Sequence, residues 1–387
     1  ILFFPSFTWS QSIQEYVDRV SIDSLMQSIY ELSGEVPVVI NGTQRTIDSR
    51  YWNEPGNAWA QDYLIQRLEN YGWTIFQQTF NTGGKNIIAR KYGTIYPGKK
   101  IILGGHFDSM PPGDSPGADD NATGTAAVLE TARILQDVSF PFTLELVLWD
   151  EEEYGLLGSA HYVDELTLAD TLIAVYNLDM LGYDANQDDR VMIHTVSNGC
   201  CGMPATIAAT AAIEYAPQLD VYTHFDGVYS SDHIPYQNGG FPAIGMTEDY
   251  QQDMNPAWHT ASDVPDSLDH DYFEQCTRWA IGTILLTQYS TEFQSQGKIM
   301  ELTAAPNPIE SFVTLYVRLE QAADVELGLY STAGERIADF FSGELSTGYH
   351  EFKVELPQLA PGTYLAGGRY STEAGGKGKL SVKLVHY

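Results

Sequence analysis

The sequence predicts an α/β fold, in which a mostly parallel central sheet is flanked by helices, followed by a small all-β sandwich domain. Two observations lead to this prediction. From about residue 14 to 295, apolar strand-like runs alternate with helical segments, which is the order typical of a sheet covered by helices. After about residue 296, short stretches of alternating hydrophobicity are separated by Gly, Pro and Ser turns, which is typical of a β-sandwich.

Helices are expected where apolar residues recur at helical spacing. In residues 56–73 the apolar side chains share one face, and Gly72 ends the helix. In residues 122–136 the helix follows Asp120 and Asn121, either of which could cap its first turn. The helices expected in chain order are residues 14–32, 56–73, 122–136, 203–216 and 269–289.

Strands are expected in the remaining apolar runs. The run 99–109 is nearly all apolar, as expected of a strand that is covered on both faces. Ligands of such sheets bind beyond the carboxyl ends of the strands, so polar residues that follow a strand are site candidates. The strands expected in the first domain are residues 86–93, 99–109, 142–149, 172–180 and 241–246. Those expected in the second are residues 313–319, 325–331, 349–356, 363–370 and 379–387.

The chain is strongly acidic, with 51 Asp and Glu against 20 Lys and Arg and a net charge of −31. Nucleic acids and anionic membrane surfaces require basic patches, so neither is expected as a partner. No stretch after the first residues of the chain approaches the roughly 20 apolar residues of a membrane span. The acidity is concentrated before about residue 300, which indicates a boundary there. The domains expected are residues 13–296 and 303–387, joined by a linker at residues 297–302.

The first residues, ILFFPSFTWSQS, form a short apolar run without a basic region. A complete signal peptide begins with a basic region and continues with an apolar one, so residues 1–12 are interpreted as the remaining tail of a truncated signal peptide. An apolar strand or arm at the N-terminus is the alternative.

The chain contains three cysteines, which are too few for a disulfide framework. Cys200 and Cys201 are adjacent, and Cys276 stands alone. The adjacent pair could form a vicinal disulfide, but ordinary buried thiols are the simpler interpretation.

Polar residues follow several of the expected strands. His106 and Asp108 lie two positions apart, so their side chains point the same way, and a metal-ligating His commonly donates its other ring N–H to a carboxylate. Asp119 and Asp120 precede a helix and could be helix caps or cation ligands. Asp179 ends an apolar strand, where a buried carboxylate is costly unless it is paired or bound to a metal.

An acidic run and two histidines complete the set of candidates. The run in WDEEEYGLLGS follows a strand directly, and His233 and His259 lie in loops beyond strands. A cluster of His, Asp and Glu without Cys suits zinc, with cobalt or manganese as substitutes. The donors are too many for one tetrahedral zinc and suit two ions bridged by a carboxylate.

From about residue 14 to 295 the chain resembles the co-catalytic dizinc exopeptidases of clan MH, specifically the secreted bacterial leucyl-aminopeptidase type. The matching pieces occur in the order of that family: GGHFDS, PGADDNATG, EEEYGLLGS, NLDM, SSDH and NPAWHT. The resemblance implies the zinc exopeptidase fold, a zinc aminopeptidase domain over residues 13–296 and two zinc ions per chain.

The resemblance also implies which residues bind the metal. His106 and Asp179 resemble the ligands of one zinc, and Glu153 and His259 resemble those of the other. Asp120 resembles the carboxylate that bridges the two ions.

Four further residues have counterparts beside the metal. Glu152 resembles the general base, and Asp108 resembles the residue that orients His106. Asp232 and His233 resemble supporting residues near the pocket rather than ligands.

Within the acidic run, alignment on Gly155 selects Glu152 as base and Glu153 as ligand. Asp150 and Glu151 are then expected to be solvated or to support the site. A slip of one residue would instead make Glu151 the base and Glu152 the ligand.

The implied activity is hydrolysis of the N-terminal residue from peptides that have a free N-terminus. A hydroxide bridging the metals is the expected nucleophile, and Glu152 is expected to take its proton and return it to the leaving amine. Three alternatives are kept: a glutaminyl cyclase of the same fold with one zinc, a carboxypeptidase of the same clan, and a non-catalytic binding protein. A carboxypeptidase would need cationic residues, which this region largely lacks, and a non-catalytic protein would be expected to lose ligands.

The C-terminal region carries a second resemblance. AAPNPIESF, LYSTAGE and LAPGTYL are similar to features of the sorting domain used in type IX secretion. The resemblance covers residues 303–387 and implies secretion to the cell surface or medium, with the type IX machinery as partner. A carbohydrate-binding module is the alternative, although the sequence has no evident aromatic platform.

Overall fold

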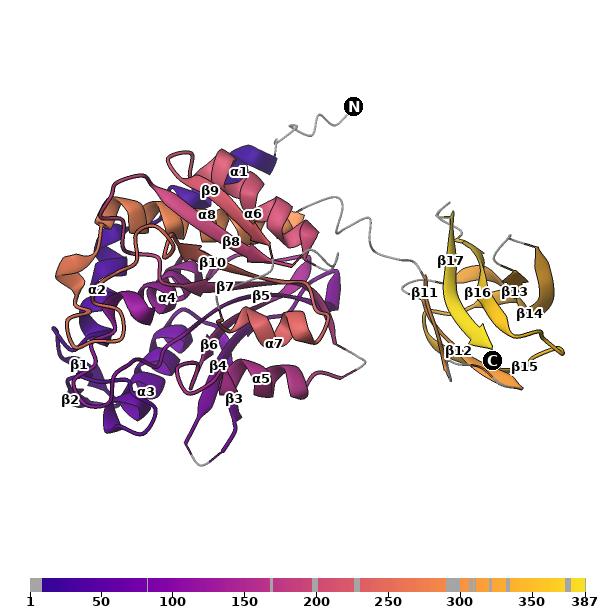
Figure 1. Ribbon diagram of the computed structural model, residues 1–387, viewed down its shortest axis with the longest axis horizontal. Helices are drawn as coiled ribbons and strands as arrows, with labels where there is room; N and C mark the ends of the chain where they lie inside the picture. Colours follow the sequence, from indigo (N-terminus) through magenta and orange to yellow (C-terminus); the bar gives the residue numbers. More distant parts are fainter. Residues whose placement is uncertain are drawn as a thin grey trace. The chain divides into compact units, whose positions relative to one another are not determined.

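The computed structural model describes residues 9–81, 83–167, 170–196, 201–225, 230–289, 300–305, 309, 311–319, 322–331, 335–372 and 377–386 (Figure 1). The chain divides into two compact units, Ile1–Ser290 and Thr291–Tyr387. No helix in the described part of the chain is long and apolar enough to cross a membrane.

The first unit is built on an eight-stranded sheet with the order β3-β4-β6-β5-β7-β10-β8-β9. The four central strands, β6, β5, β7 and β10, run parallel to one another, and β8 is parallel to β9. The β3–β4, β4–β6 and β8–β10 pairs are antiparallel. The short β3–β4 connection forces those two strands to run in opposite directions. The strands are β3 Thr74–Thr79, β4 Lys85–Lys91, β5 Tyr96–His106, β6 Phe142–Trp149, β7 Thr171–Asp179, β8 Arg190–Thr195, β9 Asp220–Phe225 and β10 Ala243–Glu248.

Helices cover both faces of this sheet. Ile102 of β5 packs with Tyr162 of α5 and Tyr236 of α7. Its neighbours Ile101 and Leu103 point to the opposite face, and α4 and α8 contact β5 as well. The helices are α1 Trp9–Val17, α2 Ile22–Leu32, α3 Pro55–Asn70, α4 Gly124–Ile134, α5 Leu157–Asp164, α6 Gly202–Tyr215, α7 His233–Asn238 and α8 His270–Tyr289. The predicted α/β fold with flanking helices is therefore confirmed.

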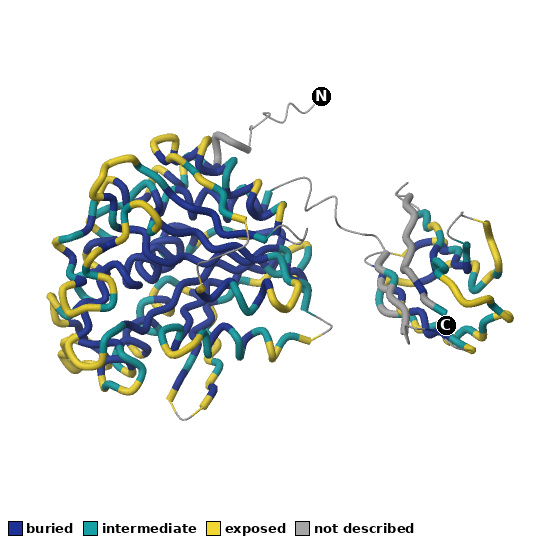
Figure 2. The backbone as a smooth tube through the Cα atoms, viewed as in Figure 1, coloured by how far each residue is buried: buried dark blue, intermediate teal, exposed yellow. Residues whose placement is uncertain are grey.

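The observed elements differ from the expected ones in several places. The helix expected over residues 14–32 is two helices, because Ser21 caps α2 by accepting a hydrogen bond from the N–H of Ser24. Strands β3, β8 and β9 and helices α5 and α7 were not expected. Strands β3 and β9 form the edges of the sheet, and their side chains are mostly exposed or half-buried, whereas β8 is largely buried. Figure 2 shows the contrast with the central strands, and every residue of β6 is buried. Smaller elements are β1 Val38–Ile40, β2 Thr43–Arg45 and a 3₁₀ turn, Pro265–Ser267.

The second unit consists of two antiparallel sheets, with the orders β11-β12-β15 and β14-β13-β16-β17. Val317 and Leu319 of one sheet share a core with Leu327 and Leu329 of the other, so the sheets pack face to face as a sandwich. The strands are β11 Met300–Ala305, β12 Phe312–Leu319, β13 Ala323–Ser331, β14 Arg336–Leu345, β15 Gly348–Glu355, β16 Gly362–Ser371 and β17 Lys377–His386. Strand β11 begins inside the segment expected as a linker, and α1 begins inside residues 1–12.

Candidate metal centre

Three strand ends bring the first candidate residues together. His106 is the last residue of β5, and Asp179 is the last residue of β7. Glu152 and Glu153 lie in the turn that follows β6. Because β5 runs parallel to both β6 and β7, the carboxyl ends of the three strands meet at one edge of the sheet.

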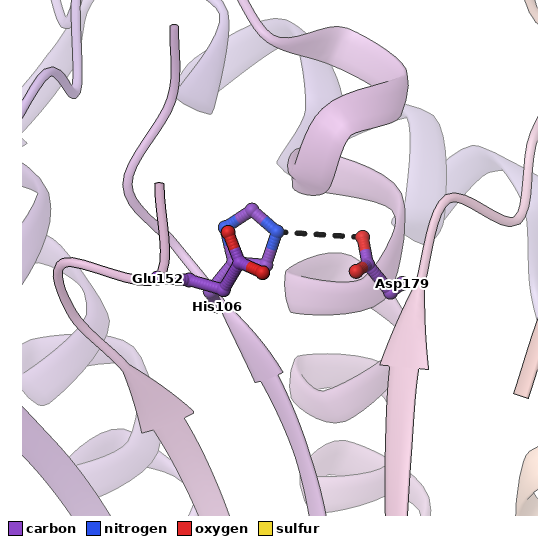
Figure 3. A group of neighbouring side chains, drawn as sticks. All are labelled: His106, Glu152 and Asp179. Atoms are coloured by element: carbon purple, nitrogen blue, oxygen red, sulfur yellow. Dashed lines mark hydrogen bonds and ion pairs between the residues drawn. The ribbon is translucent and has the colours of Figure 1, made fainter. Parts of the chain in front are cut away.

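His106, Glu152 and Asp179 form one group of donor atoms, which all lie within 4.8 Å of one another (Figure 3). The Nε2 atom of His106 lies 3.3 Å from Oδ1 of Asp179. His106 and Asp179 are buried, and Glu152 is half-buried. Figure 3 shows that the three side chains come from separate segments and converge on one point.

Asp120, Glu153 and His259 form a second group. The Nε2 atom of His259 lies 2.8 Å from Oε2 of Glu153 and 3.1 Å from Oδ2 of Asp120. Asp120 lies in a π-helical turn, Ala118–Thr123, directly before α4, and His259 lies in the loop between β10 and α8. Oε1 of Glu153 is buried and has no hydrogen-bond partner among the described residues.

The carboxylate of Asp120 joins the two groups. Its Oδ1 lies 3.3 Å from Nε2 of His106, and its Oδ2 lies 3.1 Å from Nε2 of His259. One carboxylate therefore contacts an imidazole from each group.

Asp108 connects His106 to the acidic run. Its Oδ1 lies 3.4 Å from Nδ1 of His106 and accepts a hydrogen bond from the main-chain N–H of Glu152 at 3.1 Å. Its Oδ2 accepts the N–H of Glu153 at 3.2 Å. Asp108 thus fixes the backbone of both acids in addition to contacting His106.

The other two acids of the run, Asp150 and Glu151, are buried and form hydrogen bonds outside the two donor groups. This corrects the expectation that they could be solvated. Asp150 accepts hydrogen bonds from the side chains of Asn57 and Gln61, at 2.9 and 3.0 Å. Glu151 accepts a hydrogen bond from Asn81 at 2.6 Å. Neither belongs to a donor group, so the contacts favour the register in which Glu152 and Glu153 face the site.

The site holds more buried negative than positive charge. Burial, followed by the charge of Asp120, raises the pKa of Glu153 to about 8, and burial raises the pKa of Glu152 well above its ordinary range. Burial also acts to raise the pKa of Asp120, but hydrogen bonds and charges from His106 and His259 hold it well below its usual value. The carboxylates repel one another, and a bound cation would relieve that repulsion, since buried charges require a partner or a metal. Imidazole and carboxylate donors fit zinc.

Asp232 and His233 lie beside these groups at the start of α7 and belong to neither of them. Burial raises the pKa of Asp232 to about 7. Burial lowers the pKa of His233 to about 3, and both of its ring nitrogens are without a hydrogen-bond partner in the part of the chain that the structure describes.

Arg50 was not among the predicted site residues, and its side chain is fully buried against the segments that lead to Asp108 and Asp119. Its guanidinium donates hydrogen bonds to the main-chain oxygens of Phe107, Leu32, Pro116 and Gly117, at 2.6 to 2.8 Å. It holds the segments before Asp108 and Asp119 in place. The sequence around Arg50 gives no signal of this role.

Asp263 was also missed, and Asp119 turned out to be neither a cap nor a member of a donor group. Asp263 accepts hydrogen bonds from the main-chain N–H groups of Asp119 and Asp120. Asp119 accepts hydrogen bonds from the N–H of Gly182 at 3.0 Å and from the side chain of Asn255 at 2.8 Å. These acids tie ligand-bearing segments to one another.

The fold and the joined donor groups define a class of protein: an α/β protein with a candidate two-metal centre at the carboxyl edge of its sheet. The profile of Peptidase family M28 matches residues 86–284, just over half of the chain. The chain therefore belongs to peptidase family M28.

Three individual relatives share 20 to 30% of their aligned residues with this chain. The chain is similar to aminopeptidase YwaD of Bacillus subtilis, with 30% identity over 200 residues that cover 50% of this chain and 43% of the relative. LapA of Legionella pneumophila has a TM-score of 0.62 at 22% identity, over 74% of this chain and 79% of LapA. A glutaminyl cyclase of Porphyromonas gingivalis has a TM-score of 0.56 at 20% identity, over 68% of this chain and 98% of the cyclase. These two structures support the fold alone, and the chain spans about half the length of the curated relatives it matches.

Proposed function

We propose that this chain is a zinc aminopeptidase that binds two zinc ions and removes N-terminal residues from peptides with a free N-terminus. The observation that carries the proposal is the carboxylate of Asp120, which contacts both His106 and His259. A carboxylate shared by two groups of His and acid donors is the arrangement that a bridged pair of ions requires. Membership of peptidase family M28 and the similarity to an aminopeptidase support the reaction class.

The donor set suits this assignment. His106 and Asp179 would hold one ion, Glu153 and His259 would hold the other, and Asp120 would lie between them. Zinc bound there would lower the pKa of water and polarise the scissile carbonyl.

Glu152 is assigned to proton transfer. Its side chain lies among the donor atoms of His106 and Asp179, and its main-chain N–H is fixed by Asp108. A carboxylate beside the reacting atoms can take a proton from water and return it to the leaving amine. Glu153 is less suited to that task, because its side chain is already directed at His259 and Asp120.

Hydrolysis of aminoacyl chromophores tests the proposal directly. The metal-free chain should be inactive, and adding zinc should restore hydrolysis in proportion to occupancy. Substrates with a blocked α-amine serve as the control and should not be cleaved. If the zinc-loaded chain hydrolyses none of a panel of free-amine substrates, the proposal fails.

Cyclisation of N-terminal glutamine by one zinc ion is the second candidate, since a glutaminyl cyclase shares the fold. Two joined donor groups favour the peptidase over this alternative. Metal analysis separates the two: one zinc per chain together with cyclisation of a glutaminyl peptide would replace the aminopeptidase assignment.

We also propose that residues 303–387 direct type IX secretion and that the enzyme acts outside the cell. The sequence features in this region and its compact β-sandwich support the proposal. Placing residues 303–387 behind a periplasmic reporter in a bacterium with this system should move the reporter to the surface or medium. Retention in the periplasm would contradict the proposal, and binding of the sandwich to polysaccharide would favour a carbohydrate-binding module.

A further inference from the structure

We propose that Asp263 is a positioning residue that sets the bridging carboxylate of Asp120 in place before any metal binds. The inference rests on the ligand roles given under the proposed function. Nothing in the family motif or in the acidic run points to Asp263, which lies beyond the NPAWHT segment.

Asp263 accepts hydrogen bonds from the main-chain N–H groups of three successive residues. Its Oδ1 accepts a hydrogen bond from the N–H of Asp119 at 3.0 Å, and its Oδ2 accepts the N–H of Asp120 at 3.0 Å. Its main-chain oxygen accepts the N–H of Ala118, also at 3.0 Å. The residue is only 1% exposed, so water does not compete for these contacts.

These N–H groups need an acceptor from outside their own segment. They lie at the start of the turn Ala118–Thr123, where the first N–H groups of a helix have no partner within it. Asp120 has φ −103° and ψ 92°, which is outside the helical region, so the turn does not form by regular helix geometry. A buried N–H group without a partner is strongly unfavourable. Asp263 therefore determines the backbone conformation at the residue whose side chain joins the two donor groups.

Asp263 also couples two ligands that are far apart in sequence. It lies four residues after His259 in the same loop, and its own N–H donates to the main-chain oxygen of Thr260. At the other end of this loop, Asn255 donates to Asp119. The loop that carries His259 is thus fastened at both ends to the turn that carries Asp120, across a separation of 144 residues at Asp263.

Asp263→Asn is the sharpest test, because it keeps the shape of the side chain but replaces one acceptor oxygen with an NH₂ donor that faces an N–H group. Asp266→Asn is the matched control, since it removes the same charge from an exposed position three residues away. Zinc dissociation constants of the full chain are measured by competition with a chromophoric chelator. The visible absorption of cobalt-loaded protein reports the coordination geometry.

We expect Asp263→Asn to weaken binding of at least one zinc equivalent by about 10- to 100-fold and to change the cobalt spectrum. Asp266→Asn should bind and absorb like the wild type. A purely structural role would lower the melting temperature but leave the zinc constants and the cobalt spectrum of the folded variant unchanged, and that result overturns the inference. If the wild type binds no zinc, the proposed function fails first; if it binds two ions and Asp263→Asn binds them equally well, only this inference fails.

Hydrogen exchange in the metal-free wild type gives an independent test that does not depend on a variant folding. The amides of Asp119 and Asp120 should be protected from exchange before zinc is added, because their acceptor is a protein carboxylate. Rapid exchange of both amides in folded, metal-free protein would overturn the inference.

Discussion

Glu151 and Glu152 are neighbours with different surroundings. Glu151 is paired with Asn81 and is 1% exposed, whereas Glu152 lies among the donor atoms of His106 and Asp179. The two residues have the same side chain, and the two possible registers of the acidic run assign the general base to one or the other. Substituting each of them in turn therefore tests the register directly.

Glu152→Gln should retain zinc but lower kcat by about 10²- to 10⁴-fold, because an amide cannot accept the proton. Zinc content by elemental analysis and kcat on an aminoacyl chromophore measure the two effects. Glu151→Gln is the matched control and should keep most of the activity. If the losses are reversed between the two variants, the alternative register is correct.

His233 should make the protein sensitive to acid. Burial lowers its pKa to about 3, whereas an unfolded histidine titrates near 6.5. The unfolded chain therefore binds this proton first, and stability is lost as the pH falls from about 6.5 towards 3, by up to about 1.4 kcal/mol per pH unit. His233→Leu should flatten the pH dependence of the free energy of unfolding, measured by urea denaturation with chelator present.

His270→Leu provides the control for that experiment. His270 is exposed at the start of α8, so its removal takes away no buried imidazole. Equal slopes for wild type and His233→Leu would show that His233 does not stay neutral in the folded state.

The side chains of the site could be predicted from the sequence only where a local pattern marks them. His106 and Asp108 are two residues apart at a strand end, and the acidic run is continuous, so both were visible. Arg50 and Asp263 were not, because each acts on main-chain groups that are distant in sequence. No local pattern records such contacts.

At the scale of elements, the start of α4 packs closely against the end of β7. A Cβ atom at Gly124 would lie 2.7 Å from the main-chain oxygen of Leu178 and 2.5 Å from Oδ1 of Asn121. This close approach places the turn that carries Asp120 beside the strand that ends at Asp179. Glycine is required there because any larger residue would separate them.

Gly124→Ala should destabilise the protein by about 1–3 kcal/mol, as overpacking does in a dense core. It should also weaken zinc binding, because it moves Asp120 relative to Asp179. Urea denaturation and zinc titration measure these effects. Gly202→Ala in α6 is the control, since a Cβ atom there meets nothing within 4 Å. Wild-type stability of Gly124→Ala would contradict the close packing.

Most buried elements could be predicted from hydrophobic patterns, and β6 was predicted with its observed ends. The turn Ala118–Thr123 could not, because its conformation depends on Asp263 and on hydrogen bonds of Asn121 to the N–H of Gly124 and the oxygen of Leu178. Edge strand β3 was missed because its side chains are largely exposed, which leaves little apolar pattern to detect.

At the scale of the whole molecule, each unit has its own buried core. The sandwich core is formed by residues of its own strands, and the candidate metal centre lies entirely within the first unit. The two units divide between Ser290 and Thr291, and the sequence predicted a boundary near residue 300 from a change of charge and pattern.

A chain ending at Ser290 should therefore fold, bind zinc and hydrolyse substrate with kcat and KM within about twofold of the full chain, since domains with their own cores fold alone. Calorimetry should show that its unfolding transition matches one transition of the full chain. A large loss of kcat with zinc still bound would show that the sandwich contributes to catalysis.

The carboxylates of Asp108, Asp119 and Asp263 each accept hydrogen bonds from main-chain N–H groups, and Asp108 also contacts the ring of His106. Among the contacts of the described residues, His106 is the one proposed ligand whose side chain touches any of these three carboxylates. We therefore expect that replacing Glu153 or His259 leaves the loop that presents it in place. On this arrangement, we expect the loops to keep their places when the number or the kind of bound metal ions changes.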